Sequence, residues 1–299
     1  MKKIIVIGSS NTDMVIKTKK LPLPGETCLG GTFLMNPGGK GANQAVAAAR
    51  LGGKVTFIVK TGNDLFGNQA VALFKKEGID TGYAVKDSEL PSGVALITVD
   101  ETGENSIVVA SGSNANLVKQ DISLPLFDDN KFEILLLQLE IPVTTVEYAA
   151  EKASGKGIKV ILNPAPAQIL SENLLKHVWL ITPNETEAEI LTGISITDIH
   201  SAEVAALALQ KKGVKNVIIT LGEEGAYVKS ESYTGLVPGL KVNAVDTTAA
   251  GDVFNGAVAV AVTEGIDLRE AVVFANKAAS VSVTRLGAQA SAPYRNEII

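Results

Sequence analysis

The sequence contains little of what several common protein classes need. Cys28 is the only cysteine, so neither an intrachain disulfide nor a metal site built on paired cysteines can form. The two histidines, His177 and His200, lie apart from every glycine-rich segment. We expect both at the surface or at helix ends, and we do not expect catalysis centred on an imidazole.

Aromatic residues and positive charge are also scarce. Aromatic residues make up 5% of the chain and the formal net charge is -5, whereas a nucleic-acid surface needs basic clusters and stacking rings. No apolar run approaches the ~18 residues of a membrane span, and the first one stops at Gly8, short of a signal-peptide core. We therefore expect no nucleic-acid partner, no membrane association and a cytoplasmic location.

Three nucleotide-binding signatures are missing from the chain. The sequence has no GxxxxGK[ST], no GxGxxG and no kinase-type HRD. A Walker-type ATPase is therefore excluded, and a simple Rossmann dehydrogenase becomes a weak alternative. Phosphoryl transfer remains open, because it needs mainly positioning, charge stabilisation and a base beside the attacking hydroxyl.

Short runs rich in Ile and Val alternate with stretches that carry Ala, Leu, Glu and Lys at helical spacing. Strands are predicted at 4–7, 55–59, 134–139, 160–162, 180–181 and 217–221. Helices are predicted at 41–51, 66–77, 143–154, 185–191, 202–212, 252–264 and 268–284. This alternation indicates a layered α/β sheet.

Two segments, about 12–33 and 92–110, break this alternation. Both look extended and punctuated by turns, with no helix between their strands. Neither is long enough for an independent core, so we expect them to form a small sheet over the main one. Residues 1–299 are therefore predicted to be one domain with a β-sheet lid.

The most informative segment runs from Asp246 to Gly256. Two carboxylates, Asp246 and Asp252, bracket five small residues, and a long Ala/Val-rich run follows. Small residues allow backbone N–H groups to surround a ligand, and the positive end of the following helix favours an anion there. Asp252 is then either a helix cap or a base beside an anion site.

A second glycine-rich segment, 36–44, also leads into a predicted helix. It places Gly38, Gly39 and Gly41 around Lys40 and is followed by Asn43, a set that offers close backbone approach and donors for a polyol. A tight turn with a solvated lysine is the alternative.

Polar side chains also follow several predicted strands, at the edge where an open α/β sheet binds ligands. They are Asn11, Asp13, Glu140, Asn163, Asn184, Glu187, Thr220 and Gly222. Helix caps and turn residues are the alternative for each of them, and Asn184 with Glu187 has the spacing of a capping box.

Residues 38–43 and 246–252 together resemble the two signatures of the ribokinase-like sugar kinases. The similarity extends over essentially the whole chain, including 163–166, 182–187, 220–222 and 284–289. The resemblance implies a doubly wound, mainly parallel sheet flanked by helices, with a small β-sheet lid that also forms a homodimer interface. It also implies transfer of the ATP γ-phosphoryl group to a sugar hydroxymethyl group.

The resemblance assigns roles residue by residue. Asp252 becomes the catalytic base, beside an anion hole at Gly251, Ala250 and Ala249. The sugar is expected against Asn11, Asp13, Gly39, Lys40, Asn43, Glu140 and Asp252. ATP is expected against Asn184, Thr220, Gly222, Gly225, Gly251 and Asn276. Glu187 is expected to organise Mg²⁺ through water, and an activating monovalent cation, usually K⁺, is expected near Asp246, Thr248, Ser282, Arg285, Gly287 and Ser291.

Several positions bear on the expected activity. Ala249 stands where many relatives have glycine, but alanine is also frequent there and does not threaten the resemblance. Val253 stands where threonine is common, but backbone donors survive without its hydroxyl, so only a modest effect is expected. The first expected substrate is D-ribose, phosphorylated at O5, with deoxyribose, fructose or a nucleoside as alternatives. Met14, where some relatives have histidine, leaves deoxyribose open. A catalytically silent sensor would be expected to lose Gly251 or Asp252, and both are present.

Overall fold

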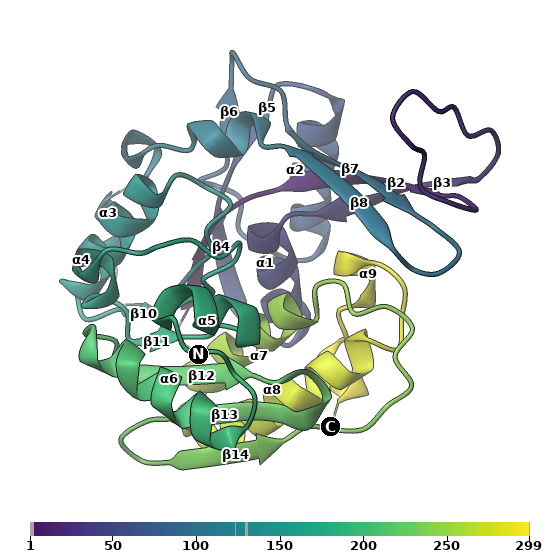
Figure 1. The fold of residues 1–299 in the computed structure, drawn as a ribbon. Helices are drawn as coiled ribbons and strands as arrows, with labels where there is room; N and C mark the ends of the chain where they lie inside the picture. The colour runs from purple at the N-terminus through teal and green to yellow at the C-terminus, as the bar shows by residue number, and fades with distance from the viewer. Residues whose placement is uncertain (1–2, 123, 129–130, 299) are drawn as a thin grey trace.

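The computed structural model describes residues 3–122, 124–128 and 131–298. An eight-stranded sheet lies between two layers of helices, and a separate four-stranded sheet projects from its edge (Figure 1). The predicted fold class, a doubly wound and mainly parallel α/β sheet with a small extra sheet, is therefore confirmed.

The main sheet has the strand order β14-β13-β12-β11-β10-β9-β1-β4. The strands are β1 (Lys3–Ile7), β4 (Lys54–Ile58), β9 (Phe132–Leu137), β10 (Lys159–Leu162), β11 (Leu180–Ile181), β12 (Asn216–Thr220), β13 (Gly225–Lys229) and β14 (Thr234–Pro238). The first six are parallel and confirm the predicted strands. The antiparallel hairpin β13–β14 was not predicted, because glycines and a proline interrupt its apolar pattern.

Helices cover both faces of the main sheet, as the alternation of buried side chains along β1 requires. Ile4 and Val6 pack with the layer of α1 (Lys40–Arg50), α2 (Leu65–Lys76), α7 (Ala250–Thr263) and α8 (Leu268–Ser282). Ile5 and Ile7 pack with the layer of α3 (Val143–Ser154), α5 (Glu185–Thr192) and α6 (Ile199–Lys211). These helices match the predicted ones within three residues. Among the described residues, no helix is both long and apolar enough to cross a membrane.

Close packing between α1 and α7 positions the functional segments. A Cβ atom at Gly256 would lie 2.9 Å from the backbone nitrogen of Ala48 and 3.0 Å from the carbonyl oxygen of Gln44. The two helices therefore approach until their backbones nearly touch, which only glycine allows. This contact brings the first turns of α1 and α7, the two glycine-rich segments, to one end of the sheet.

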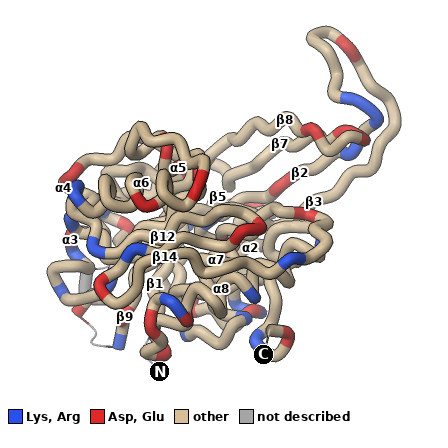
Figure 2. The backbone as a smooth tube through the Cα atoms, turned by 60° about the horizontal axis from the view of Figure 1, so that its bottom comes forward, with Lys and Arg blue, Asp and Glu red and all other residues tan. Residues whose placement is uncertain are grey.

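The small sheet has the strand order β3-β2-β7-β8. Its strands are β2 (Asn11–Lys17), β3 (Thr32–Gly38), β7 (Gly93–Val99) and β8 (Asn105–Ala110). Figure 2 shows these strands extending away from the body of the molecule. The first segment of the small sheet was predicted to end at about residue 33, but β3 continues to Gly38. Residues 36–38 of β3 pair with residues 11–13 of β2 instead of forming a turn.

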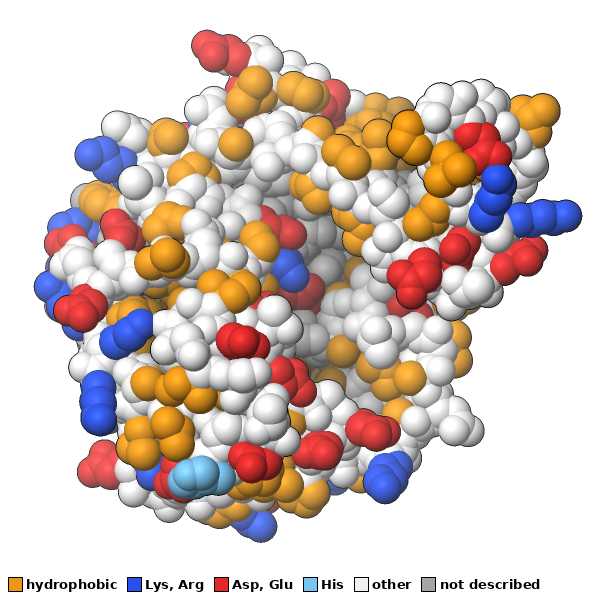
Figure 3. All heavy atoms as spheres, in the orientation of Figure 1, with side chains coloured by type: hydrophobic (Ala, Val, Ile, Leu, Met, Phe, Trp, Pro, Cys, Tyr) orange, Lys and Arg blue, Asp and Glu red, His pale blue; other side chains and the backbone are white. Residues whose placement is uncertain are grey.

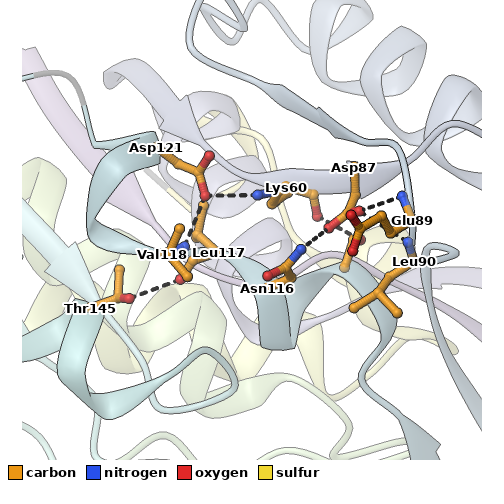
Figure 4. A network of polar contacts seen from close by, with 10 residues as sticks. Lys60, Asp87, Glu89, Leu90, Asn116, Leu117, Val118, Asp121 and Thr145 are labelled. Atoms are coloured by element: carbon orange, nitrogen blue, oxygen red, sulfur yellow. Dashed lines mark hydrogen bonds and ion pairs between the residues drawn. The ribbon is translucent and has the colours of Figure 1, made fainter.

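A polar network supports the base of the small sheet (Figure 4). Lys60 in β5 (Lys60–Gly62) pairs with Asp121 at 2.9 Å, and Asn116 donates to Asp87, at the end of β6 (Val85–Asp87), at 2.7 Å. These contacts hold the short 3-10 segments η1 (Gly112–Asn116) and η2 (Lys119–Asp121) against the strands. The η1 segment carries Asn114, which reaches the candidate site.

The remaining elements are short. They are α4 (Glu172–Leu175), α9 (Ala288–Ser291), η3 (Leu124–Asp128), η4 (Gly222–Glu224) and η5 (Arg295–Glu297). His177 lies just after α4 and contacts Ser154 at 2.8 Å, while His200 is exposed in the first turn of α6. Both histidines are therefore at helix ends, as expected.

Candidate active site

A polar cavity opens beyond the carboxyl ends of the parallel strands. The space-filling view shows the molecule hollowed there, with basic and acidic side chains in the hollow (Figure 3). The cavity has a volume of about 170 Å³. Its lining consists of Lys40, Asn163, Ala165, Thr182, Asn184, Glu187, Thr220, Thr247, Ala249, Ala250, Gly251, Asp252 and Asn255.

Asp252 lies in the first turn of α7 and is almost completely buried, with 5% of its surface exposed. Its Oδ2 accepts a hydrogen bond from Asn43 Nδ2 at 2.9 Å, and its Oδ1 accepts one from Gln44 Nε2 at 2.9 Å. The N-cap of α7 is Ala249, with no side-chain cap, so Asp252 is not a capping residue. The helix-cap alternative for Asp252 is therefore wrong, and its role as a base stays a prediction.

Two opposing effects act on the Asp252 carboxyl. Burial raises its pKa, whereas the positive charge of Lys40 and the hydrogen bonds from Asn43 and Gln44 lower it, and the net direction is upward. A base with a raised pKa is a stronger proton acceptor, provided that it remains ionised at the working pH.

The turn before α7 has an unusual backbone. Ala249 has φ 61° and ψ 12° and is the one non-glycine residue with positive φ among those described. A left-handed alanine is strained, and such strain is typical of functional loops. A Cβ atom at Gly251 would meet nothing within 4 Å, so packing does not explain this glycine. Open space beside the first N–H groups of a long helix suits an anionic ligand.

A second layer of side chains fixes this turn. Asn255 Nδ2 donates to the carbonyl oxygen of Gly251 at 2.8 Å, and Thr182 Oγ1 donates to Asn255 Oδ1 at 2.6 Å. The orientation of the Gly251 peptide is therefore tied to β11 through two buried side chains.

Three carboxylates surround Lys40. Burial alone would lower its pKa, but Asp252, Glu140 and Glu187 together raise it, so the ammonium form is held. Glu140 Oε2 accepts from the backbone N–H of Lys40 at 2.9 Å and from Ser9 Oγ at 2.5 Å. The predicted sugar-side residues on α1 and after β9 are thus brought together.

Asp13 faces the same cluster from the small sheet. Burial, Glu140 and Asp252 raise its pKa to about 6. Its carboxylate also explains Gly38, because a Cβ atom there would lie 2.1 Å from Asp13 Oδ2. Asn11, two residues before Asp13 in β2, is buried, and its Oδ1 accepts a hydrogen bond from Asn114 Nδ2 at 2.7 Å.

The glycine loop before α1 leaves donors and acceptors for a ligand. Gly39 has φ 89°, and a Cβ atom there would lie 2.8 Å from Ser10 Cα, so both conformation and space require glycine. Asn43 Oδ1 is buried without a hydrogen-bond partner among the described residues. A buried orphan oxygen is costly, so a bound hydroxyl group would be a favourable partner.

The segment after β11 forms the capping box considered for it, and its role toward a ligand stays a prediction. Glu187 Oε2 accepts from the Asn184 N–H at 2.9 Å and Asn184 Oδ1 accepts from the Glu187 N–H at 2.8 Å, which completes a capping box. Both side chains also line the cavity. Burial raises the pKa of Glu187, although the bond from Asn184 and the charge of Lys40 oppose the rise.

The predicted nucleotide-side residues are only partly gathered. Thr220 lines the cavity and Gly222 is exposed with open space around it, whereas a Cβ atom at Gly225 would lie 2.2 Å from the carbonyl oxygen of Val237. Close packing within the β13–β14 hairpin therefore explains the glycine at position 225 without a bound nucleotide. Asn276 lines a separate cavity of about 180 Å³, and its amide donates to the carbonyls of Val237 and Pro238 at 3.3 and 3.1 Å. The structure does not place Asn276 beside Asp252.

Asp246 joins two loops at the predicted cation site. Its carboxylate accepts from the N–H groups of Thr248 and Gly287, each at 2.9 Å. Burial would raise its pKa, but these bonds make the net shift downward. The Oγ atoms of Ser282 and Ser291 donate to nearby carbonyls, and the Arg285 guanidinium pairs with Glu297 at 2.6 Å. Of Arg285, only the backbone is left for a cation.

Several buried polar residues at this site were not predicted as functional. Gln44 bonds Asp252 and Asn163, while Asn255 and Thr182 hold the Gly251 peptide. Their positions in the sequence could have indicated a functional role. Gln44 directly follows Asn43 in the glycine-rich segment, and Asn255 lies three residues after Asp252 in α7.

Comparison with known proteins identifies carbohydrate kinases as relatives of this chain. A model of the pfkB family of carbohydrate kinases matches residues 1–295. The ribokinase of Haemophilus influenzae is 47% identical over 298 residues, covering 100% of this chain and 97% of that protein. The deoxyribokinase of Salmonella typhi is 40% identical over 291 residues, covering 97% and 95% of the two proteins.

The fold comparison agrees with the family match. The structure of Arabidopsis thaliana ribokinase complexed with ribose and ATP superposes with a TM-score of 0.92 at 31% identity, over 99% of this chain and 97% of that one. The polar cavity between α1 and α7 is thus part of a sugar kinase fold. The chain belongs to the pfkB family of carbohydrate kinases.

Proposed function

We propose that this protein is an ATP-dependent ribokinase, which transfers the γ-phosphoryl group of ATP to O5 of D-ribose and releases ADP and ribose 5-phosphate. The observation that carries the proposal is the buried Asp252 carboxylate, held by Asn43 and Gln44 beside the open backbone at Gly251. Full-length relatives that are ribokinases support ribose as the acceptor.

In this scheme Asp252 accepts the proton from the ribose 5-hydroxyl group. The O5 oxygen then forms a bond to the γ-phosphorus while the bond to the β,γ-bridging oxygen breaks, and the electron pair leaves with ADP. The backbone N–H groups of Ala249 and Gly251 would face the developing negative charge, where a helix N-terminus stabilises an anion. The Ala250 N–H donates to the Thr247 carbonyl at 3.2 Å and so supports the turn. Lys40, held as an ammonium group by its acidic neighbours, adds positive charge in the same cavity.

The sugar is proposed to bind among Asn11, Asp13, Gly39, Lys40, Asn43 and Glu140. Asp13 and Glu140 supply carboxylate oxygens that accept hydrogen bonds from hydroxyl groups. A sugar hydroxyl would also satisfy Asn43 Oδ1, a buried oxygen without a hydrogen-bond partner among the described residues. Gly39 keeps this part of the wall free of side chains.

ATP is proposed to bind along Asn184, Thr220, Gly222, Gly225, Gly251 and Asn276, with its phosphates toward Gly251. The empty surroundings of Gly251 fit a phosphate group, because no part of the chain fills that space. Mg²⁺ would bring charge neutralisation to the phosphates. Apart from the proposed base Asp252, Glu187 is the carboxylate in the cavity lining, which fits an ion held mainly by water and phosphate oxygens.

A monovalent cation, K⁺, is proposed between the loops at 246–248 and 282–291. The described residues contain no cluster of three or more acidic or metal-ligating side chains. Asp246 is the single carboxylate among Thr248, Ser282, Arg285, Gly287 and Ser291, so the donors are mostly neutral oxygens. A site of this kind suits a large cation of low charge better than a divalent one.

Deoxyribose is the second candidate acceptor. Met14 follows Asp13 in β2, so strand alternation directs its side chain to the opposite face of the small sheet, and it supplies no polar contact to a 2-hydroxyl oxygen. A site that hydrogen-bonds the 2-hydroxyl group rejects the deoxy sugar by orders of magnitude, whereas an apolar contact discriminates weakly. The ratio of kcat/KM for ribose and 2-deoxyribose therefore separates the two candidates.

The proposal is tested by ADP release with Mg-ATP, potassium and a panel of sugars. Ribose should give turnover, and Asp252→Asn should lower kcat by at least about a thousandfold, while ribose binding measured by calorimetry is largely retained. Turnover that does not need ribose, or that persists in Asp252→Asn, would contradict the scheme.

The small sheet is proposed to be the lid of a single kinase domain spanning 1–299 and the interface of a homodimer. One face exposes Ile16 (46%), Phe33 (60%), Leu96 (56%) and Val108 (66%), and the opposite face exposes Ile107 (52%) and Val109 (51%). Apolar side chains gather on this part of the surface in Figure 3. A second copy of the sheet is the occupant with matching chemistry. A cytoplasmic location, where ATP is available, completes the proposal.

A further inference from the structure

Asp252 is the end of a chain of buried amides. Gln44 Nε2 donates to Asp252 Oδ1 at 2.9 Å and to Asn163 Oδ1 at 3.1 Å, and Gln44 Oε1 accepts from Gln138 Nε2 at 2.6 Å. Gln44 and Gln138 have no exposed surface, and Asn163 is 6% exposed. The chain thus connects β9, β10, α1 and α7 out of contact with solvent.

The direction of these bonds follows from the chemistry of the groups. An ionised carboxylate only accepts, so Gln44 must turn its NH₂ group toward Asp252. Its oxygen then faces Gln138, which must offer its own NH₂ group. Gln138 Oε1 points toward Gly8, where a Cβ atom would lie 2.1 Å from it. Glycine at the end of β1 therefore makes room for the amide that fixes Gln44.

We propose that Gln44 is a positioning residue for the base, and that Gln138, through Gln44, holds one donor permanently on Asp252 Oδ1. This inference rests on the proposed role of Asp252. With Gln44 on Oδ1 and Asn43 on Oδ2, the carboxylate cannot rotate without losing a bond, so its free lone pairs stay directed into the cavity. Asn43 belongs to the proposed sugar site, whereas all the hydrogen bonds of the Gln44 amide are made with buried protein groups.

Other charged groups face Asp252 from each neighbouring element. They are Lys40 of α1, Glu140 after β9, Asp13 of β2 and Glu187 of α5. Three of these are acids, which favour a protonated Asp252. Lys40 and the two amides oppose them, so removal of the Gln44 donor should make the carboxylate easier to protonate.

The test uses three variants of the full chain. Gln44→Met removes the donor at similar length, and Gln138→Met keeps the donor but frees Gln44 to turn. The matched control is Asn216→Ala, which removes another buried amide whose Nδ2 donates to the Trp179 carbonyl at 3.0 Å at the opposite end of the sheet. All three should lose stability, so stability alone cannot separate a positioning role from packing.

The deciding readout is the pH profile of kcat with saturating ribose and Mg-ATP. Gln44→Met should lower plateau kcat about tenfold and move the acid limb up by about one pH unit, with little change in KM. Gln138→Met should shift the limb in the same direction by less, and Asn216→Ala should not shift it. An unchanged limb and kcat in both glutamine variants would overturn the inference, and Gln138→Met alone decides if Gln44→Met does not fold.

A second measurement separates this inference from the proposed function. NMR of the Asp252 carboxyl carbon, assigned by comparison with Asp252→Asn, follows its titration without turnover. The midpoint should rise in Gln44→Met even if ribose is not the substrate. An unchanged midpoint would overturn the role of Gln44 while leaving ribose kinase activity intact.

Discussion

At the scale of single residues, the site concentrates negative charge where the sugar is proposed to bind. Asp13, Glu140 and Asp252 act on one another, and Lys40 is the positive group that offsets them. Burial and the two neighbouring acids raise the pKa of Asp13 from 3.8 to about 6. The surroundings of Asp13 therefore disfavour its ionised form, and a sugar hydroxyl that donates to this carboxylate would offset the cost.

The raised pKa of Asp13 has a defined effect on stability. Between pH 3.8 and about 6 the folded chain holds the Asp13 proton more tightly than the unfolded chain. Stability from this group is thus lost as the pH rises through about 6. Asp13→Asn should raise the free energy of unfolding by roughly 2 kcal/mol near pH 8, after allowance for partial solvent screening, while lowering kcat/KM for ribose at least about tenfold.

Urea unfolding at about pH 8 and about pH 4.5 checks this prediction, because the gain should fall to roughly a third at the lower pH, where the unfolded chain is also partly protonated. Asp100→Asn is the matched control with the opposite sign. The side chain and backbone of Thr102 lower the pKa of Asp100, so its replacement should not stabilise the chain near pH 8. An equal gain for Asp13→Asn at both pH values would contradict the electrostatic explanation.

At the scale of elements, the first turns of α1 and α7 form the two halves of the site. The close contact at Gly256 fixes their relative position, and the strained Ala249 turn shapes the start of α7. The loop of Asp246 leads into that turn and is held to Gly287. A change at Asp246 should therefore reach the anion site through the backbone, without touching the base.

Asp246→Ala should weaken activation by potassium. The carboxylate is proposed both to contact the cation and to hold the Thr248 and Gly287 N–H groups. We expect the ratio of kcat/KM with and without potassium to fall at least about fivefold, by analogy with the loss of a first contact to a bound ion. In Asp252→Asn, by contrast, the loss should be the same at every potassium concentration.

Asp267→Ala provides the control for this experiment. Asp267 likewise accepts from two backbone N–H groups, those of Arg269 and Glu270 at 2.9 and 3.2 Å, but at the N-cap of α8. Its loss should cost stability and leave potassium activation unchanged. Equal, potassium-insensitive losses in Asp246→Ala and Asp252→Asn would count against separate roles for the two acids.

At the scale of the whole molecule, the small sheet is the part that the main core explains least. It projects from the body in Figure 2 and has apolar side chains exposed on both faces. An uncovered apolar sheet with two free edges favours association. Because β2 of this sheet carries Asp13, association would also act on the proposed sugar site.

Leu96→Lys and Val108→Lys should therefore shift the protein from dimer to monomer. Light scattering at micromolar concentration measures the shift, and the KM for ribose should rise with it. Ile169→Lys, at an apolar side chain that is 89% exposed outside the small sheet, is the matched control and should leave the mass unchanged. A wild-type monomer, or variants that remain dimeric, would contradict the proposed interface.

Much of the fold follows from local patterns along the chain. The parallel strands of the main sheet and its long helices were predicted within a few residues, because burial imposes a repeat on the sequence of each element. The two glycine-rich segments were also recognised, since glycine and small residues are required by local backbone geometry. The β13–β14 hairpin was not, because its apolar pattern is short and interrupted.

The sequence by itself determined the elements, the candidate acids and the membership in a sugar kinase family. Only the tertiary structure decided which amides hold Asp252, that Gly225 serves the hairpin and that Asn276 faces another cavity. Gln44 and Asp252 are 208 residues apart in the chain, and they meet because Gly256 allows α1 and α7 to pack closely. Local patterns specify elements, but partners across the core depend on how those elements pack.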